Sequence, residues 1–377
     1  MASSVIGLDI GTTALRAVEL SPGKKAKPIL LHAYEVPLPH GAVVKGEVIN
    51  SKVVEAGLKK LWSAGGFKGK DVVLGIGNQG IFARDLSVPK MSLNRIRESL
   101  PFQVQDMLQA PLADSLLDFY PVSETLGERG PMINGLLIAA EKRSILENIR
   151  TVEAAGLIPT EVDLIPFALN RLLITRPQLE GTVALVDVGA GTTSILISCD
   201  GVPNFVRFIP AGGDDLTVAL TIGLDIETPK AEELKRSLVY RPELVSDVSS
   251  DLEPLKCSCP RCVSEVIEIE PPAIDNSHAL EVLEAVAGDL LNGIRNTIKY
   301  FANVRPQDPV VQILITGGGS RLTGFSESLA EMTRIPVFTA DPFSSLTLPR
   351  RRKTKMFQCD KDAIAVAIGL ALGEQAS

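Results

Sequence analysis

The chain has little of what marks a membrane or secreted protein. It contains no apolar run of about 18 or more residues, the length that suggests a bilayer-spanning helix. Its N-terminus lacks a basic region and soon reaches Asp9, which is typical of a strand and not of a secretory signal. The 5 cysteines show no disulfide-framework spacing, which indicates a reducing compartment. We therefore expect a cytoplasmic protein.

The chain also lacks an excess of positive charge. Its 38 Lys and Arg residues are outnumbered by 45 Asp and Glu, and the net charge is −7. This disfavours a general nucleic-acid-coating role, because such proteins need a cationic surface. With 377 residues, 45% of them hydrophobic and 22% charged, the chain is typical of a globular protein of about two to three domains.

A repeated pattern is the most informative feature of the sequence. Residues 5–20 read as a strand, a tight turn and a second strand, with Asp9 near the end of the first strand. Residues 184–198 have the same form around Asp187. In both copies a glycine follows the aspartate by two residues and a Thr-Thr pair lies close behind. The copies are about half the chain apart, which predicts two similar halves.

The turn residues of both copies suit phosphate binding. Glycine allows positive φ and lets a phosphate approach the backbone closely. Successive N–H groups and Thr hydroxyls can donate to phosphate oxygens. A carboxylate at the end of each strand can hold a hydrated Mg²⁺. The alternative, a pair of ordinary hairpins, explains one copy easily but explains a repeat at half-chain spacing poorly.

Two further glycine clusters and one helical stretch also have residues that suit the binding of a nucleotide. An apolar strand runs into Gly317-Gly318-Gly319, where bare backbone suits a flat ring or a ribose and the next helix N-terminus favours anions. Gly212-Gly213 precedes an N-capped helix. Glu232 and Lys235 share one face of the next helical stretch. An ordinary strand–helix turn or a solvated ion pair would explain each of these features taken alone.

In this order the features resemble the actin-like ATPase superfamily, and within it the PilM family of type IV pilus assembly. Residues 87–91, the helical stretch 292–301 and the segment Ala340-Asp341-Pro342-Phe343 carry the PilM resemblance, which covers nearly the whole chain. The resemblance implies an α/β fold of the actin-like (ribonuclease H-like) type. Such a fold has two lobes around a nucleotide cleft, here with an extra subdomain of the FtsA and PilM kind.

The resemblance also implies that the cleft binds ATP and Mg²⁺. Asp9 and Asp187 would flank the metal through water. Glu232 and Lys235 would contact ribose and adenine, and Leu322 would complete the adenosine motif. The full expected set is Asp9, Gly11, Thr12, Thr13, Asp187, Gly189, Gly191, Thr192, Thr193, Gly212, Gly213, Glu232, Lys235, Gly317, Gly318, Gly319 and Leu322.

The family pattern further implies the domain organisation. The second lobe is expected to have an upper subdomain that contains a cysteine-bearing insertion at 240–276. The expected boundaries are 1–87 and 166–180 for the first lobe, with a C-terminal connector helix at 361–377; 88–165 for the extra subdomain; 181–215 and 307–360 for the core of the second lobe; and 216–306 for its upper subdomain.

The insertion departs from the family pattern. It is rich in Pro, Ser and acidic residues, and it contains Cys257, Cys259 and Cys262. Three thiols at this spacing could supply three zinc ligands, with a fourth from elsewhere. The alternative is a solvated loop with reduced cysteines, and the residues alone leave both open.

The resemblance implies a function as an ATP-binding scaffold in a type IV pilus or related secretion-type machine. The chain would bind the cytoplasmic N-terminal tail of a PilN-like membrane protein, in a groove between the first lobe and the extra subdomain. It would reach the inner face of the cytoplasmic membrane only through that partner. Pilus assembly ATPases are further candidate partners, and nucleic acid is not expected.

Two alternatives remain open at this point. One is an FtsA-like cell-division scaffold, and the other, ranked third, is an active phosphotransferase. Hydrolysis of ATP needs a group that positions water in line with the terminal phosphate. No residue can be assigned to that role from spacing, so we expect hydrolysis to be slow at most.

Overall fold

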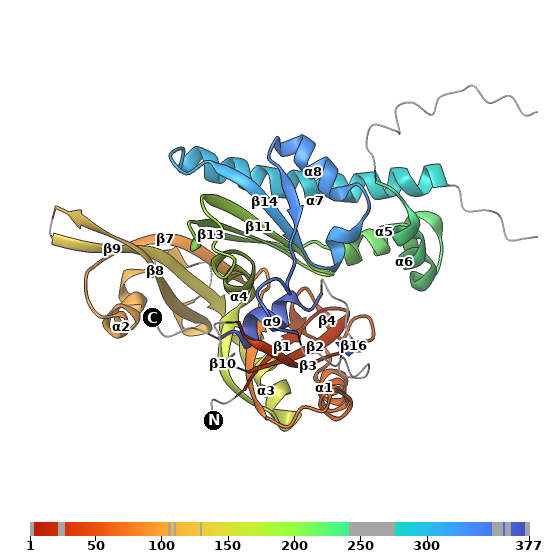
Figure 1. Ribbon diagram of the computed structural model, residues 1–377, viewed down its shortest axis with the longest axis horizontal. Coiled ribbons are helices and arrows are strands. Elements are labelled where there is room, and N and C mark those ends of the chain that lie inside the picture. The colour runs from red at the N-terminus through yellow and green to blue at the C-terminus, as the bar shows by residue number, and fades with distance from the viewer. Residues whose placement is uncertain are drawn as a thin grey trace, which may run out of the picture.

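The computed structural model consists of two lobes and a smaller sheet beside them (Figure 1). In Figure 1 the first lobe lies at the lower right, the second lobe lies above it, and the smaller sheet extends to the left. The residues that the structure describes are 4–21, 27–104, 107–108, 111–128, 130–240, 276–348, 357–358 and 363–373.

The first lobe is built on a six-stranded mixed sheet. The strand order is β10 (Ile158–Leu164), β6 (Asp71–Ile76), β1 (Val5–Ile10), β2 (Ala14–Ser21), β3 (Ile29–Pro37) and β16 (Phe357–Gln358). The strands β1, β2 and β3 form an antiparallel meander, whereas β6 pairs with β1 in parallel. The long buried runs of β1 and β2 fit strands that are covered on both faces.

Helices α1 (Ser51–Gly65) and α3 (Lys142–Ala154) pack on one face of this sheet. The side chain of Asn50 caps α1 by accepting a hydrogen bond from the Val53 N–H at 3.3 Å. Its buried residues Val54, Leu58 and Leu61 recur at helical spacing and face the strands. A short hairpin, β4 (Val43–Val44) and β5 (Glu47–Val48), lies between β3 and α1.

The second lobe repeats the topology of the first. Its sheet has the order β13 (Val202–Ile209), β12 (Thr193–Cys199), β11 (Thr182–Val188), β14 (Val310–Thr316) and β15 (Val337–Thr339). The meander β11-β12-β13 with the parallel strand β14 matches β1-β2-β3 with β6. Two similar halves, as the sequence repeat predicts, are therefore present.

The helices of the second lobe share one apolar core with the β11–β14 sheet. The long helix α7 runs across the top of the lobe in Figure 1, with α5 and α6 near one end. The helices are α5 (Gly213–Leu224), α6 (Thr228–Ser237), α7 (Asn276–Val304), the short η5 (Gly318–Arg321) and α8 (Phe325–Thr333).

A further core joins the two lobes. It combines Val18 and Leu30 of the first sheet with Val183 and Leu185 of the second, and all four are buried. Three short helical segments complete it: α4 (Ile165–Asn170), η3 (Arg171–Thr175) and α9 (Ala365–Ala371). Because these residues come from both lobes, a common packed core joins the two lobes.

The extra subdomain has a three-stranded antiparallel sheet and its own core. The strand order is β7 (Ile81–Pro89), β9 (Gly130–Glu141) and β8 (Ser115–Gly127), with helix α2 (Leu93–Gln103) and the single turn η2 (Leu112–Asp114). The core includes Ile96 and Leu100 of α2 with Phe119 and Leu137 of the sheet. This subdomain therefore has the packing of a small independent layer.

The strand pairings differ from the expected subdomain boundaries of 88–165 at both ends. β7 pairs with β9 over residues 81–89, so the subdomain sheet begins earlier. β10 pairs with β6, and Val152 of α3 lies in the core around α1, so α3 and β10 belong to the first lobe. Strand partners depend on tertiary packing more than on local sequence. The other expected boundaries stay predictions.

The predicted zinc ligands lie outside the residues that the structure describes. Cys257, Cys259 and Cys262 lie there, so the zinc hypothesis stays a prediction. Within the described ranges, no helix has both the length and the apolar character that crossing a membrane would require.

Candidate functional site

The first aspartate of the repeat, Asp9, forms an ion pair with an arginine on the neighbouring strand. Asp9 on β1 is directly opposite Arg16 on β2, and it is only 5% exposed. Arg16 Nη1 lies 3.4 Å from Asp9 Oδ2, and Arg16 Nε donates to Glu35 Oε2 at 2.7 Å. Burial raises the pKa of Asp9, and the Arg16 charge opposes this rise. The ion pair holds the Asp9 carboxylate at the mouth of the first turn.

The second turn closes in the same way as the first. The Gly189 N–H donates to Thr192 O at 2.9 Å, just as the Gly11 N–H donates to Ala14 O at 3.1 Å. These are equivalent positions in the two halves. The shared hydrogen bond explains why the same turn residues recur in the sequence.

The two turns meet across the cleft between the lobes. A Cβ placed on Gly191 would lie 2.6 Å from Thr12 Oγ1 of the first turn, so the two turns are in close contact at this point. Asp187 lies close enough to Asp9 to feel its charge. Burial first, and then the Asp9 carboxylate, raises the pKa of Asp187 to about 7. The two acidic groups, one from each lobe, therefore lie within electrostatic range of each other.

The other glycine clusters close around the second turn. A Cβ on Gly317, which has φ 89°, would lie 2.5 Å from Asp187 Oδ1. A Cβ on Gly213 would lie 3.2 Å from Gly319 Cα, so the two clusters touch each other. Gly318 differs, because a Cβ there would meet nothing within 4 Å. These backbones form one cradle with open space above Gly318.

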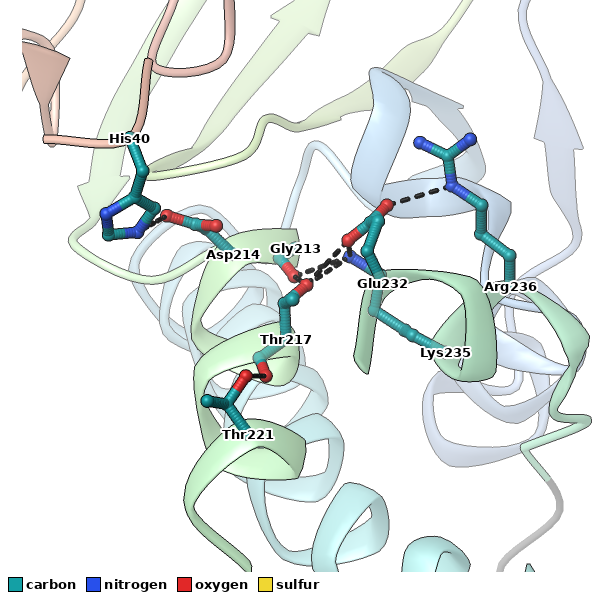
Figure 2. Close-up of polar contacts among 8 residues, drawn as sticks. All are labelled: His40, Gly213, Asp214, Thr217, Thr221, Glu232, Lys235 and Arg236. Atoms are coloured by element: carbon teal, nitrogen blue, oxygen red, sulfur yellow. Dashed lines mark hydrogen bonds and ion pairs between the residues drawn. The ribbon is translucent and has the colours of Figure 1, made fainter. Parts of the chain in front are cut away.

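Helices α5 and α6 are joined by a polar network beside this cradle (Figure 2). The Lys235 ammonium donates to Gly213 O at 2.9 Å, Thr217 Oγ1 at 2.7 Å and Glu232 Oε2 at 2.6 Å. An ammonium has three donors, so Lys235 uses them all within the protein. Burial acts to raise the pKa of Glu232, but hydrogen bonds from Lys235 and Thr217 outweigh it and hold the pKa below its usual range.

The structure separates the predicted site residues into two groups. Thr193 is fully buried and donates to Ala211 O at 2.8 Å, so it holds the loop before Gly212 from beneath. Leu322 is also buried and packs in the core of the second lobe. The predicted residues that converge on the cleft are Asp9, Gly11, Thr12, Asp187, Gly189, Gly191, Gly212, Gly213, Gly317 and Gly319. Their ligand roles stay predictions.

Several polar residues of the cleft were not singled out by the sequence. Arg16 could have been found, because its spacing from Asp9 across a tight hairpin predicts a cross-strand pair. Arg236 donates to Glu232 Oε1 at 2.9 Å and is 77% exposed, which leaves its guanidinium beside the cleft. His40 Nε2 of the first lobe lies 3.3 Å from Asp214 Oδ2 of α5 (Figure 2). That contact between lobes has no signature in the sequence.

The geometry fits a nucleotide with a hard divalent metal. Tight backbone cradles suit phosphates, and the open space at Gly318 suits a ring or a ribose. In the described parts of the chain, no group of three or more His, Cys, Asp or Glu residues could hold a metal. Asp9 and Asp187 would therefore share Mg²⁺ with phosphate oxygens and water, which is how proteins usually bind it.

One prediction follows from the acid pair in the ligand-free protein. The pKa of Asp187 is about 7 in the folded chain against 3.8 ordinarily, so the folded state loses stability as pH rises from about 4 through about 7. Asp187→Asn removes this loss. Each pKa unit is worth about 1.4 kcal/mol, and partial exposure of the side chain reduces the sum, so we expect about 1–3 kcal/mol of stabilisation at pH 8.

Urea unfolding with a chelator present measures this effect. The stabilisation should disappear at about pH 3, below the ordinary pKa of 3.8, where both states of the wild-type chain carry the proton. A difference in unfolding free energy that is the same at both pH values would contradict the acid pair.

Comparisons with known proteins agree with this geometry. The family model described as type IV pilus assembly protein PilM matches residues 7–269 and 272–375. The cell division protein FtsA of Bacillus subtilis is 26% identical over 213 residues, which are 56% of this chain and 45% of that protein. FtsA of Pseudomonas aeruginosa is 24% identical over 366 residues, covering 90% of this chain and 83% of that protein. The match to the Bacillus protein thus spans less than half of its length.

Solved structures give the same fold. A PilM–PilN type IV pilus biogenesis complex superposes with TM-score 0.78 at 23% identity, covering 99% of this chain and 98% of that one. MreB5 of Spiroplasma citri bound to ADP superposes with TM-score 0.52 at 14% identity, covering 98% and 96%. The prediction of an actin-like two-lobed α/β fold is confirmed.

Proposed function

This chain belongs to the PilM family of type IV pilus assembly proteins, and on that premise we propose that it is a nucleotide-binding scaffold of a pilus or related secretion-type machine. One observation carries the nucleotide part: glycine-lined turns of both lobes converge on two facing acidic groups. Asp9 and Asp187 would hold Mg²⁺, which when bound neutralises phosphate charge. The MreB5 structure of the same fold was solved with ADP, which supports this assignment.

The scaffold part of the proposal concerns the tail of a PilN-like membrane protein. The solved PilM–PilN complex supports such a partner. From the sequence we expected the groove between the first lobe and the extra subdomain, and that groove stays a prediction. Ile81 and Leu136 of the subdomain pack there with Leu164 of β10, and the Tyr120 and Phe167 rings lie 4.8 Å apart.

A second candidate docking place is a cavity of about 670 Å³ between the extra subdomain and the second lobe. Residues 81–84 of β7 form one wall and residues 205–208 of β13 form the other. Both strands are the last in their sheets, so each presents an unpaired backbone edge. An extended peptide between them can gain main-chain hydrogen bonds while its side chains enter the cavity. We therefore propose this groove as the place where the tail binds.

The groove is tied to the second lobe at one end. Arg305, which follows α7, donates to Asn204 Oδ1 at 2.9 Å and lies 3.2 Å from Asp85 Oδ1 on β7. The other end of α7 lies near α5 and α6, beside the nucleotide cradle (Figure 1). A movement of the second lobe on nucleotide binding would therefore change the width of the groove. Such coupling is reciprocal by thermodynamic necessity.

The partner also explains how the chain would reach a membrane. With a net charge of −7, attraction to anionic lipid is weak. Capture of the partner's cytoplasmic tail would hold the chain at the inner face of the cytoplasmic membrane. Location should then depend on the partner and not on lipid composition.

A two-way titration tests the proposal. A synthetic PilN-type tail is titrated into the full chain with and without Mg-ATP, and Mg-ATP is titrated with and without the tail. We expect Mg-ATP to tighten tail binding about fivefold or more, and the tail to tighten Mg-ATP binding by the same factor. A scrambled tail serves as the control. Equal binding of both peptides would contradict the scaffold function.

A further inference from the structure

One segment of the first lobe, residues 38–50, contacts the first turn, the second turn and the start of α5. The Leu38 N–H donates to Thr13 O of the first turn at 2.8 Å. His40 reaches Asp214 at the start of α5. The main chain of Lys45 lies against the second turn, since a Cβ on Gly191 would be 3.2 Å from the Lys45 nitrogen. This segment thus closes one end of the cleft.

Lys45 occupies the tip of this segment in an unusual conformation. It is the first residue of the two-residue turn between β4 and β5, and the turn has φ 49° at Lys45 and 82° at Gly46. Such turns favour Asn, Asp or Gly at both positions. Gly46 is required, because a Cβ there would lie 2.6 Å from Gly77 O. The backbone conformation at position 45, by contrast, does not favour a lysine.

The charges around the turns suggest what the Lys45 side chain does. Arg16 is paired with Asp9 and Glu35, and Lys235 uses its three donors within the protein. Among the described residues, Lys45 has no ion-pair partner; it is half-buried, and its main chain lies beside Gly191, where the two turns meet. A cation held there by a clamped turn is available to an anion in the cleft.

The position of Lys45 along the cleft decides which part of a nucleotide it would meet. Lys235 of α6 donates to Gly213 O, the Gly213 N–H donates to Gly189 O at 2.9 Å, and the Lys45 main chain lies against Gly191 of the same turn. The base would lie at the α6 end. We propose that the Lys45 ammonium binds the terminal phosphate, so that this chain prefers a nucleoside triphosphate to a diphosphate. The inference rests on the nucleotide site proposed above.

Calorimetric titration of the full chain with Mg-ATP and with Mg-ADP tests this role. Lys45→Asn removes the ammonium but suits the turn, so the melting temperature should not fall. A hydrogen bond between charged groups is commonly worth a factor of ten or more, so we expect Mg-ATP affinity to fall about tenfold and Mg-ADP affinity less than about twofold. Lys45→Arg should keep the preference, and Lys52→Asn, on an exposed lysine of the same lobe, should change neither affinity.

Two outcomes would overturn the inference, and they differ from failure of the nucleotide site. If Lys45→Asn weakens both nucleotides equally, or neither, while the wild-type chain binds both, Lys45 does not contact the terminal phosphate. If the wild-type chain binds neither nucleotide, the cleft itself is wrong and the role of Lys45 fails with it.

Discussion

Asp187→Ala and Gly318→Val should each abolish Mg-ATP binding while leaving the fold intact. The first removes one of the two carboxylates, one from each lobe, that lie within electrostatic range of each other. The second puts a branched side chain into the open space above the cradle, where the adenosine would lie. Gly318 is exposed and a Cβ there touches nothing within 4 Å, so the change should not disturb the protein itself. We expect a loss of about 100-fold or more for each, equivalent to about 2.7 kcal/mol.

The measurement is calorimetric titration, with a glycine outside the cleft as the control. Gly288 lies on α7, and a Cβ there would meet only the Tyr240 hydroxyl at 3.9 Å. Gly288→Ala should keep wild-type affinity. Circular dichroism checks that each variant is folded. Wild-type affinity in both cleft variants would remove the proposed nucleotide site.

The turns could be predicted from the sequence because their chemistry is local. Asp9 and Asp187 each end a strand, and the glycines after them close the turns with equivalent hydrogen bonds. Repetition at half-chain spacing then predicts that equivalent strands lie at equivalent places in two lobes. The meeting of the two aspartates follows from this symmetry and needs no knowledge of side-chain packing.

The same reasoning cannot tell which of two adjacent residues faces the cleft. Thr192 and Thr193 are neighbours, yet Thr193 is fully buried under the loop. Successive side chains of a strand point to opposite faces, and β12 begins at Thr193. A one-residue difference in where the strand begins therefore decides whether a threonine faces the cleft or the core. The sequence does not define strand ends that closely.

Contacts between segments that are distant in the chain could not be predicted from the sequence for a different reason. The ion pair of Arg305 with Asp85, and the contact of His40 with Asp214, each join residues that are far apart in the chain. Nothing in the sequence around these residues indicates which distant residue each of them would contact. The groove between β7 and β13 was likewise not expected, since it depends on how the extra subdomain packs against the second lobe.

The second large expected effect is a loss of tail binding on substitution of a residue in the groove between β7 and β13. Tyr300 of α7 lines it, is 56% exposed and lies 5.9 Å from the Phe205 ring between centroids. An exposed tyrosine in a concave site is the kind of residue that dominates peptide affinity. Tyr300→Ala should weaken binding of a PilN-type tail about 30-fold, equivalent to about 2 kcal/mol. Its effect on Mg-ATP binding without the tail should be small, because Tyr300 lies far along α7 from the cradle.

Phe338→Ala provides the matched control for this experiment. Phe338 is a similarly exposed aromatic residue, at 51%, on the same sheet of the second lobe. It lies on β15, at the opposite edge from β13, so it cannot reach a peptide bound between β13 and β7. Both variants remove a large exposed ring, so any general loss of surface hydrophobicity affects them alike. A tail affinity that falls in Tyr300→Ala and is unchanged in Phe338→Ala therefore locates the peptide at this edge, whereas equal affinities would place it elsewhere.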